Sequence, residues 1–174
     1  SLSFDGEDDL IEISPSRSIN AIRVLSIAFW IKANKAQNPK GKWGHTGLVT
    51  RWSFEDPICA FGIWIGAGRI AICVWPVNQV NQFMPFEKEV WQHIVYTHDV
   101  SDASIYVDGE QKSRTQLSIN LRESNIPLII GADNESARGR HRFFSGQLDD
   151  IRIYNRALSE AEVKELYDFE KAKE

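Results

Sequence analysis

The sequence predicts an all-β protein made of two antiparallel sheets packed face to face, with one short helix at its C-terminal end. Three observations predict this class. Short segments of alternating apolar and polar residues recur along the chain, turn residues separate them, and helical periodicity is almost absent before residue 159. Two packed sheets are the usual way for a β chain of 174 residues to protect its sheet edges.

The composition is that of one globular domain with a large apolar core. Hydrophobic residues make up 43% of the chain, aromatic residues 11%, and six residues are tryptophan. The net charge of -4 comes from interspersed acids and bases, so the chain has no basic stripe for a nucleic-acid partner. The chain contains no run of eighteen apolar residues, so no membrane-spanning helix is predicted. The N-terminus lacks the basic and apolar regions of a signal peptide.

The first long strand is expected at residues 24–33. Leu25, Ile27 and Phe29 alternate with smaller or polar residues, which is typical of a strand with one face in the core. Trp30 then lies on the opposite face, where we expect it to pack rather than to bind a ligand.

Two cysteines, Cys59 and Cys73, lie in the arms of one predicted hairpin that turns at residues 66–68. A pairing centred on Gly66 places the cysteines opposite each other, whereas a three-residue loop centred on Ala67 does not. The sequence therefore allows either a disulfide between the two cysteines or two buried free thiols.

The central part of the chain reads as a meander of short strands. Residues 91–97 and 103–107 form a hairpin around a polar turn, and Asp108-Gly109 turns into a third strand that begins at Glu110. A short apolar strand at 127–131 and a polar loop at 134–142 follow.

The C-terminal segment predicts a closing strand that runs into a capped helix. Ser159 and Glu162 form a capping box, and Leu158 and Val163 stand at the positions of a hydrophobic staple. We expect the helix at Glu160–Phe169 to pack on the sandwich. Residues 1–169 are then one domain, and the charged residues 170–174 are a linker or tail of a multidomain chain.

Taken in order, several segments resemble the laminin-G-like modules, the concanavalin A-like lectin and glucanase jelly rolls of bacterial extracellular proteins. The resemblance covers nearly the whole chain. The segments that carry it are Leu2–Gly6, Asp9–Ile13, Leu25–Lys32, Trp91–Asp99, Ile105–Gly109, Leu128–Gly131 and Phe144–Tyr154.

The resemblance implies a two-sheet jelly-roll β-sandwich that is extracellular or on the cell surface. It implies a non-catalytic carbohydrate-binding module of a larger protein, with an adhesion, protein-binding or structural domain without a sugar site as the alternative. It also implies a structural Ca²⁺ ion, with Asp5 and Asp149 as ligands. In the other interpretation, Asp5 caps its own turn, and Asp149 is solvated or paired with Arg152.

Sugar binding uses aromatic faces together with polar side chains at the rim of the site. Four tryptophans are candidates for the aromatic faces, and three basic residues are candidates for the polar contacts. Each tryptophan can equally be a buried ring, folded down over small neighbours to complete a second core layer. The predicted sugar site comprises Trp43, Trp52, Trp64, Trp75, Arg51, Arg69 and His45.

One acidic pattern, Glu7-x-Asp9-x-x-Glu12, formally matches the carboxylates of retaining glucanases. That chemistry needs two carboxyl groups about 5–5.5 Å apart on a strand central to a cleft. The pattern here falls in the expected N-terminal turn, and the four histidines are scattered along the chain. We therefore expect no catalytic residues and no enzyme activity.

Overall fold

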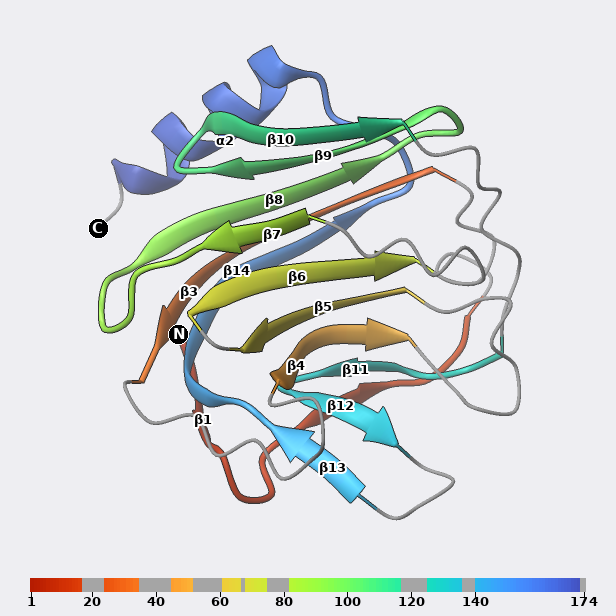
Figure 1. The fold of residues 1–174 in the computed structure, drawn as a ribbon, viewed down its shortest axis with the longest axis vertical. Coiled ribbons are helices and arrows are strands. Elements are labelled where there is room, and N and C mark those ends of the chain that lie inside the picture. The colour runs from red at the N-terminus through yellow and green to blue at the C-terminus, as the bar shows by residue number, and fades with distance from the viewer. Residues whose placement is uncertain are drawn as a thin grey trace.

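The computed structural model describes residues 1–16, 24–34, 45–51, 61–66, 68–74, 82–116, 125–135 and 140–172. Within them the chain forms two six-stranded antiparallel sheets, a two-stranded ribbon and a helix (Figure 1). The predicted all-β sandwich is confirmed. No helix among these residues is long and apolar enough to cross a membrane.

We call the first sheet sheet A. Its order is β1-β14-β3-β8-β9-β10, so the first and last strands of the chain lie side by side. The bounds are β1 Leu2–Asp5, β14 Ser145–Tyr154, β3 Leu25–Ala33, β8 Gln92–His98, β9 Asp102–Val107 and β10 Glu110–Gln116.

The second sheet, sheet B, has the order β2-β11-β4-β5-β6-β7. The bounds are β2 Ile11–Ile13, β11 Leu128–Ile130, β4 His45–Arg51, β5 Phe61–Gly66, β6 Arg69–Val74 and β7 Gln82–Pro85. The third pair consists of β12 Ala132–Glu135 and β13 Arg140–Phe143. The two ends of the segment 134–142, which the sequence predicted as a polar loop, are therefore strand.

The main core lies between sheets A and B. Strand alternation supplies it as predicted, because Leu25, Ile27 and Phe29 of β3 are buried in the same cluster as Phe61 and Ile63 of β5. Each sheet thus turns one apolar face toward the core. Its other face points outward.

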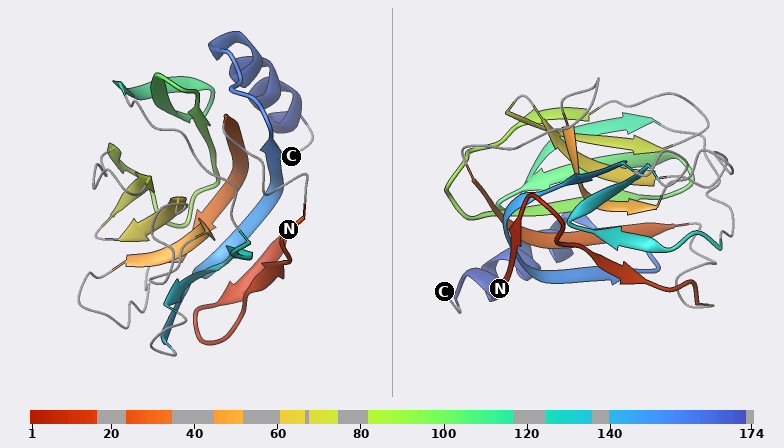
Figure 2. Two further views of the ribbon diagram at one scale, coloured as in Figure 1. Left: turned by 90° about the vertical axis from the view of Figure 1, so that its right-hand side faces the viewer. Right: turned by 90° about the horizontal axis from the view of Figure 1, so that it is seen from below.

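The helix α2, Glu160–Lys171, covers part of the outer face of sheet A (Figure 2, left). The predicted capping box is confirmed, since Ser159 accepts a hydrogen bond from the amide of Glu162 and the Glu162 carboxylate accepts one from the amide of Ser159. The helix ends two residues later than expected. Glu170 is only 2% exposed and belongs to the fold, not to the expected 170–174 tail.

In the hairpin of β5 and β6, Gly66 is paired with Arg69. Cys73 is paired with Gly62 in this register, so neither predicted centre, Gly66 or Ala67, is correct. Cys59 lies outside the described residues.

Candidate functional site

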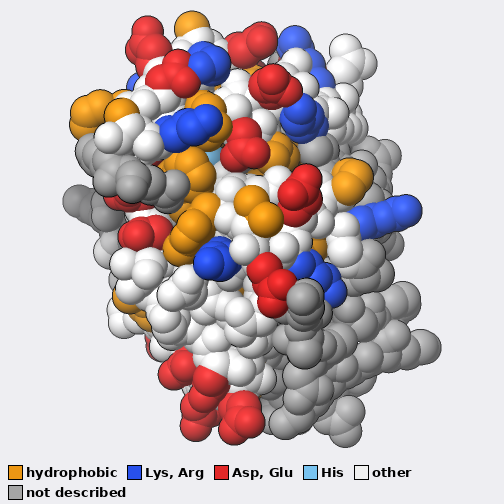
Figure 3. All heavy atoms as spheres, turned by 90° about the vertical axis from the view of Figure 1, so that its left-hand side faces the viewer, with side chains coloured by type: hydrophobic (Ala, Val, Ile, Leu, Met, Phe, Trp, Pro, Cys, Tyr) orange, Lys and Arg blue, Asp and Glu red, His pale blue; other side chains and the backbone are white. Residues whose placement is uncertain are grey.

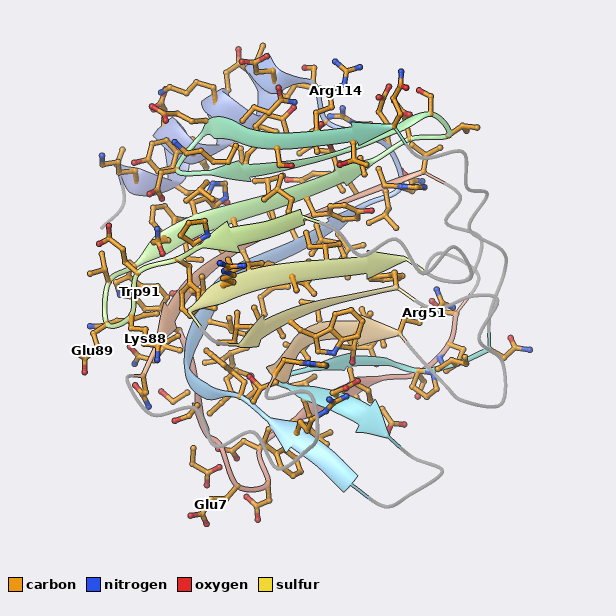
Figure 4. The ribbon with its side chains drawn as sticks, viewed as in Figure 1. Glu7, Arg51, Lys88, Glu89, Trp91 and Arg114 are labelled. Carbon is orange, nitrogen blue, oxygen red and sulfur yellow. The ribbon has the colours of Figure 1, made fainter. Side chains whose placement is uncertain are left out.

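Four of the predicted sugar-binding residues are described by the structure, and three of them, His45, Trp64 and Arg69, lie near one end of sheet B. In the register of sheet B, His45, Gly66 and Arg69 form a row at one end of the sheet. Arg51 lies at the opposite end, paired with Phe61, and is 3% exposed (Figure 4). Trp43, Trp52 and Trp75 lie outside the described residues.

Trp64 adopts the buried arrangement that was one of the two alternatives. Its side chain is on the outer face of β5 and is 9% exposed. The ring lies over Gly62, so close that a Cβ atom on Gly62 would be 2.4 Å from it. The His45 ring meets it edge-on, with 5.8 Å between the ring centroids. A sugar contact by Trp64 remains a prediction, but this ring does not present an open platform.

A buried ion pair lies on the ribbon above β4. Asp133 and Arg142 are 1% and 5% exposed and form a salt bridge across β12 and β13. The ribbon is tied to sheet B by a 3.0 Å hydrogen bond from the Thr50 hydroxyl to the Ala132 carbonyl. Burial raises the pKa of Asp133, while Arg142 and His45 lower it. The sequence showed two charges in an apparent loop and gave no sign of this pairing.

The two predicted calcium ligands lie at opposite ends of β1. Asp5 is paired with Ser145, while the carboxylate of Asp149 is 3.2 Å from the N-terminal amine of Ser1. Four residues of strand separate the two ends, roughly 13 Å at about 3.3 Å per residue. The structure therefore does not bring Asp5 and Asp149 together around one ion.

Asp5 instead lies with two other acids in the turn that follows β1. Carboxylate oxygens of Asp5, Asp8 and Asp9 lie within 4.8 Å of one another, and all three residues are exposed. Asp5 also accepts a 2.7 Å hydrogen bond from the amide of Glu7, which lowers the pKa of Asp5. The turn-capping interpretation of Asp5 is thus observed, and calcium binding remains a prediction.

The acidic pattern Glu7-x-Asp9-x-x-Glu12 lies as expected outside any central strand. Glu7 and Asp9 belong to the exposed turn between β1 and β2, which Figure 4 shows at one edge of the molecule, and Glu12 lies in β2. β1 and β2 are edge strands of sheets A and B. These carboxylates therefore do not lie on a central strand, which is the position that retaining glucanase chemistry needs.

The outer face of sheet A carries a polar and aromatic cluster under the C-terminal half of α2. The Glu170 carboxylate accepts hydrogen bonds from the Trp30 indole at 3.0 Å and from Arg152 Nε at 2.6 Å. It also lies 3.3 Å from Nε2 of His93. The Tyr167 ring stacks on Trp30 and His93, with centroids 5.8 and 5.9 Å away. We call these residues the helix lock.

Burial controls the titration of the helix lock. Burial, together with the nearby Arg152, lowers the pKa of His93 to about 4, so this imidazole is neutral at physiological pH. Burial also raises the pKa of Glu170, opposed by Arg152 and the Trp30 hydrogen bond. Sequence reasoning placed Trp30 on this face but missed its partner, because Glu170 stood in a charged stretch that resembled a tail.

Beyond the N-terminal end of α2, the same face of sheet A is open and polar. A row of paired residues crosses the sheet there, from Thr97 on β8 through Ser104 on β9 to Arg114 on β10. A groove of about 210 Å³ lies over this row, between the strands and the start of α2. Figure 4 shows Arg114 at this corner of the molecule, near the beginning of the helix. We call this groove over the strands the polar groove.

A second groove, of about 680 Å³, lies on the other side of α2. Pro85, Phe86, Val107 and Tyr167 supply its apolar lining, and acidic and basic side chains line the rest of it. Figure 3 shows one end of the molecule, on which hydrophobic side chains are intermixed with both charges. We call this second groove the mixed groove.

Comparisons with known proteins agree with this architecture. The solved binding domain of Paraclostridial Mosquitocidal Protein 1 superposes with a TM-score of 0.74 at 18% identity, covering 94% of this chain and 42% of that one. The binding domain of botulinum neurotoxin serotype G gives the same TM-score and identity, covering 97% and 42%. At these identities the likeness concerns the fold.

One curated relative is similar in sequence as well. Paraclostridial mosquitocidal protein 1 of Paraclostridium bifermentans is 28% identical over 104 residues, which is 58% of this chain and 8% of the relative. The chain therefore spans a small part of that protein and under half of the solved binding domains. A family model described as the Concanavalin A-like lectin/glucanases superfamily matches residues 5–164, and the chain belongs to this family.

Proposed function

We propose that this chain is a non-catalytic binding module of a larger extracellular or cell-surface protein, and that its ligand is a glycan. One observation carries the first part. The sequence and fold comparisons both select the mosquitocidal protein, and its solved counterpart is named a binding domain. The position of Glu7, Asp9 and Glu12 at the sheet edges supports a role without catalysis.

Two features support a glycan as the ligand. The family includes lectins by its own description. The outer face of sheet A also offers hydroxyl and amide side chains beside α2, which suit the hydroxyl-rich surface of a sugar. The predicted contacts by Trp43, Trp52, Trp75 and Arg69 remain part of this proposal.

The proposal is tested by applying the labelled chain to an array of glycans and measuring the dissociation constant of the best ligands by titration calorimetry. We expect saturable binding of at least one glycan that free sugar competes away. Binding of none of the glycans, by a chain whose circular dichroism and melting show that it is folded, would remove the glycan from the proposal.

A protein partner is the second candidate, favoured by the mixed groove. Apolar side chains bordered by both charges resemble the core and rim of a protein interface. A binding experiment on cells that bind the chain distinguishes a glycan ligand from a protein partner. Binding that survives enzymatic removal of surface glycans but not surface proteolysis indicates a protein partner, and the reverse result indicates a glycan.

Calcium also remains a proposal, with Asp5, Asp8 and Asp9 as the described residues whose oxygens could share an ion. Bound calcium would raise the melting temperature by mass action. Identical melting in excess calcium and in chelator would remove the ion from the proposal.

A further inference from the structure

The polar groove is lined by a hydroxyl group that the fold does not use. Thr97 is 6% exposed and lines the groove, and its hydroxyl has no hydrogen-bond partner among the residues that the structure describes. Its oxygen is not among the buried side-chain atoms that lack a partner, so solvent or a ligand can reach it from the groove. Its position in the lining of a groove suggests that a ligand supplies the partner.

Two neighbouring hydroxyls are only half used. The side-chain amide of Gln111 donates hydrogen bonds to the hydroxyl oxygens of Ser104 and Tyr106, at 3.0 and 3.4 Å. Since both oxygens act as acceptors, each hydroxyl keeps its own hydrogen for a further acceptor. Ser104 and Tyr106 are 6% and 4% exposed. The lining of the groove thus presents three hydroxyl donors, held on rigid strands of one sheet.

The charges around the groove argue against an anionic ligand. Asp99, Asp102 and Glu160 line it, and the cation among the lining residues, Arg114, is paired with Asp102 at 3.1 Å. The hydrogen bond from the amide of Ser101 lowers the pKa of Asp99, and the contact with Arg114 lowers that of Asp102. Both carboxylates are therefore charged at neutral pH, repel anions and accept hydrogen bonds from hydroxyl groups.

The groove volume of about 210 Å³ is below the range of roughly 300–1,000 Å³ that is typical of sites for drug-sized ligands. It corresponds to about seven water molecules at ~30 Å³ each. That is the scale of one six-membered sugar ring with its hydroxyl groups.

We propose that the polar groove binds one neutral sugar residue, with Thr97, Ser104 and Tyr106 donating hydrogen bonds to its oxygens and Asp102 accepting from its hydroxyls. This inference rests on the proposed glycan-binding function and adds to it a place on sheet A, whereas the described candidates His45, Arg51, Trp64 and Arg69 lie on sheet B.

The test is a titration of the isotope-labelled chain with glucose, galactose, mannose, N-acetylglucosamine and the best array glycan, followed by NMR. We expect the backbone amides of Thr97, Ser104 and Gln111 to shift saturably. Glucuronic acid, which differs from glucose by a carboxylate, should bind more weakly than glucose because of the acids around the groove.

Thr97→Val removes the hydroxyl and keeps the shape of the side chain. Because one neutral hydrogen bond contributes about 0.5–1.5 kcal/mol, we expect Thr97→Val to weaken binding about 2- to 12-fold, and Ser104→Ala to have a similar effect. Thr46→Val is the matched control. Thr46 is fully buried in β4 of the other sheet, and binding should be unchanged in that variant.

The failures are distinguishable. If a glycan binds but the shifts map elsewhere, or if Thr97→Val binds as tightly as the wild type, the polar groove is the wrong site and the proposed function stands. If no sugar and no array glycan binds the folded chain, both the site and the glycan function are wrong.

Discussion

Two neighbouring regions of one sheet face differ in this protein: the part that α2 and its entry segment cover, and the polar groove beside it. On the outer face of sheet A, Ser26 and Thr97 are direct cross-strand partners. The Ser26 hydroxyl donates to the Arg156 carbonyl and accepts from the Leu158 amide, both at 2.9 Å, where the chain enters α2. The Thr97 hydroxyl, one strand away, has no such contact among the described residues.

The difference shows what the helix does for polar groups on a sheet. Where α2 and its entry segment cover the face, the polar groups bond to one another, as Glu170 does with Trp30 and Arg152. Beyond the N-terminal end of the helix, the strands continue with the same alternation. Their hydroxyl groups there still have hydrogens that can be donated to a ligand. A covered region stabilises the fold, and an open region is available for a ligand.

The largest effect is expected from breaking the covered region at Glu170. Glu170→Ala leaves the indole of Trp30 and the guanidinium of Arg152 without their acceptor and creates a cavity beneath the helix. We expect a loss of about 3 kcal/mol in the free energy of unfolding. Urea denaturation measures it, and Glu170→Gln, which keeps one acceptor oxygen, should lose less. An unchanged midpoint for Glu170→Ala would show that the helix lock does not hold the helix.

The next effect is a pH dependence carried by His93. Its pKa of about 4 in the folded chain lies below the usual 6.5, so its contribution to stability is present above pH 6.5 and is lost as the pH falls towards 4. The raised pKa of Glu170 acts in the opposite sense over this range, and Arg152 and Asp150 also face the imidazole.

The dependence is isolated by comparing wild type with His93→Gln in urea at pH values from 7 to 4. We expect the wild type to lose up to about 3 kcal/mol more than the variant between pH 6.5 and 4, before the offset from Glu170. Parallel curves for the two proteins would show that His93 does not titrate against the fold.

A smaller effect is expected at Ser26. Ser26→Ala removes two hydrogen bonds and leaves the Leu158 amide and the Arg156 carbonyl without their partner at the start of the helix. We expect a loss of about 1–2 kcal/mol, seen as a lower melting temperature. A loss as large as that of Glu170→Ala would mean that the helix depends on its entry segment more than on the helix lock.

The sequence was sufficient for features that depend on local patterns. Alternation in residues 25–31 predicted which face of β3 is in the core, and Ser159 and Glu162 predicted the helix start. The helix lock was beyond reach, because Trp30 and Glu170 are 140 residues apart and only the topology brings them together. The polar groove was missed for the same reason, since its hydroxyls come from separate strands and resemble ordinary exposed strand residues.

The smallest effect, and the sharpest test of the comparison, is expected at Thr97. Thr97→Val exchanges a hydroxyl that lines the polar groove for a methyl group of nearly the same volume. We expect stability to change by less than about 0.5 kcal/mol, because no hydrogen bond within the fold is lost and the hydroxyl is open to solvent. Differential scanning calorimetry of Thr97→Val beside Ser26→Ala measures the contrast between two neighbouring hydroxyls. A clear loss in Thr97→Val would mean that its hydroxyl already serves the fold, and the two regions of the face would then be alike.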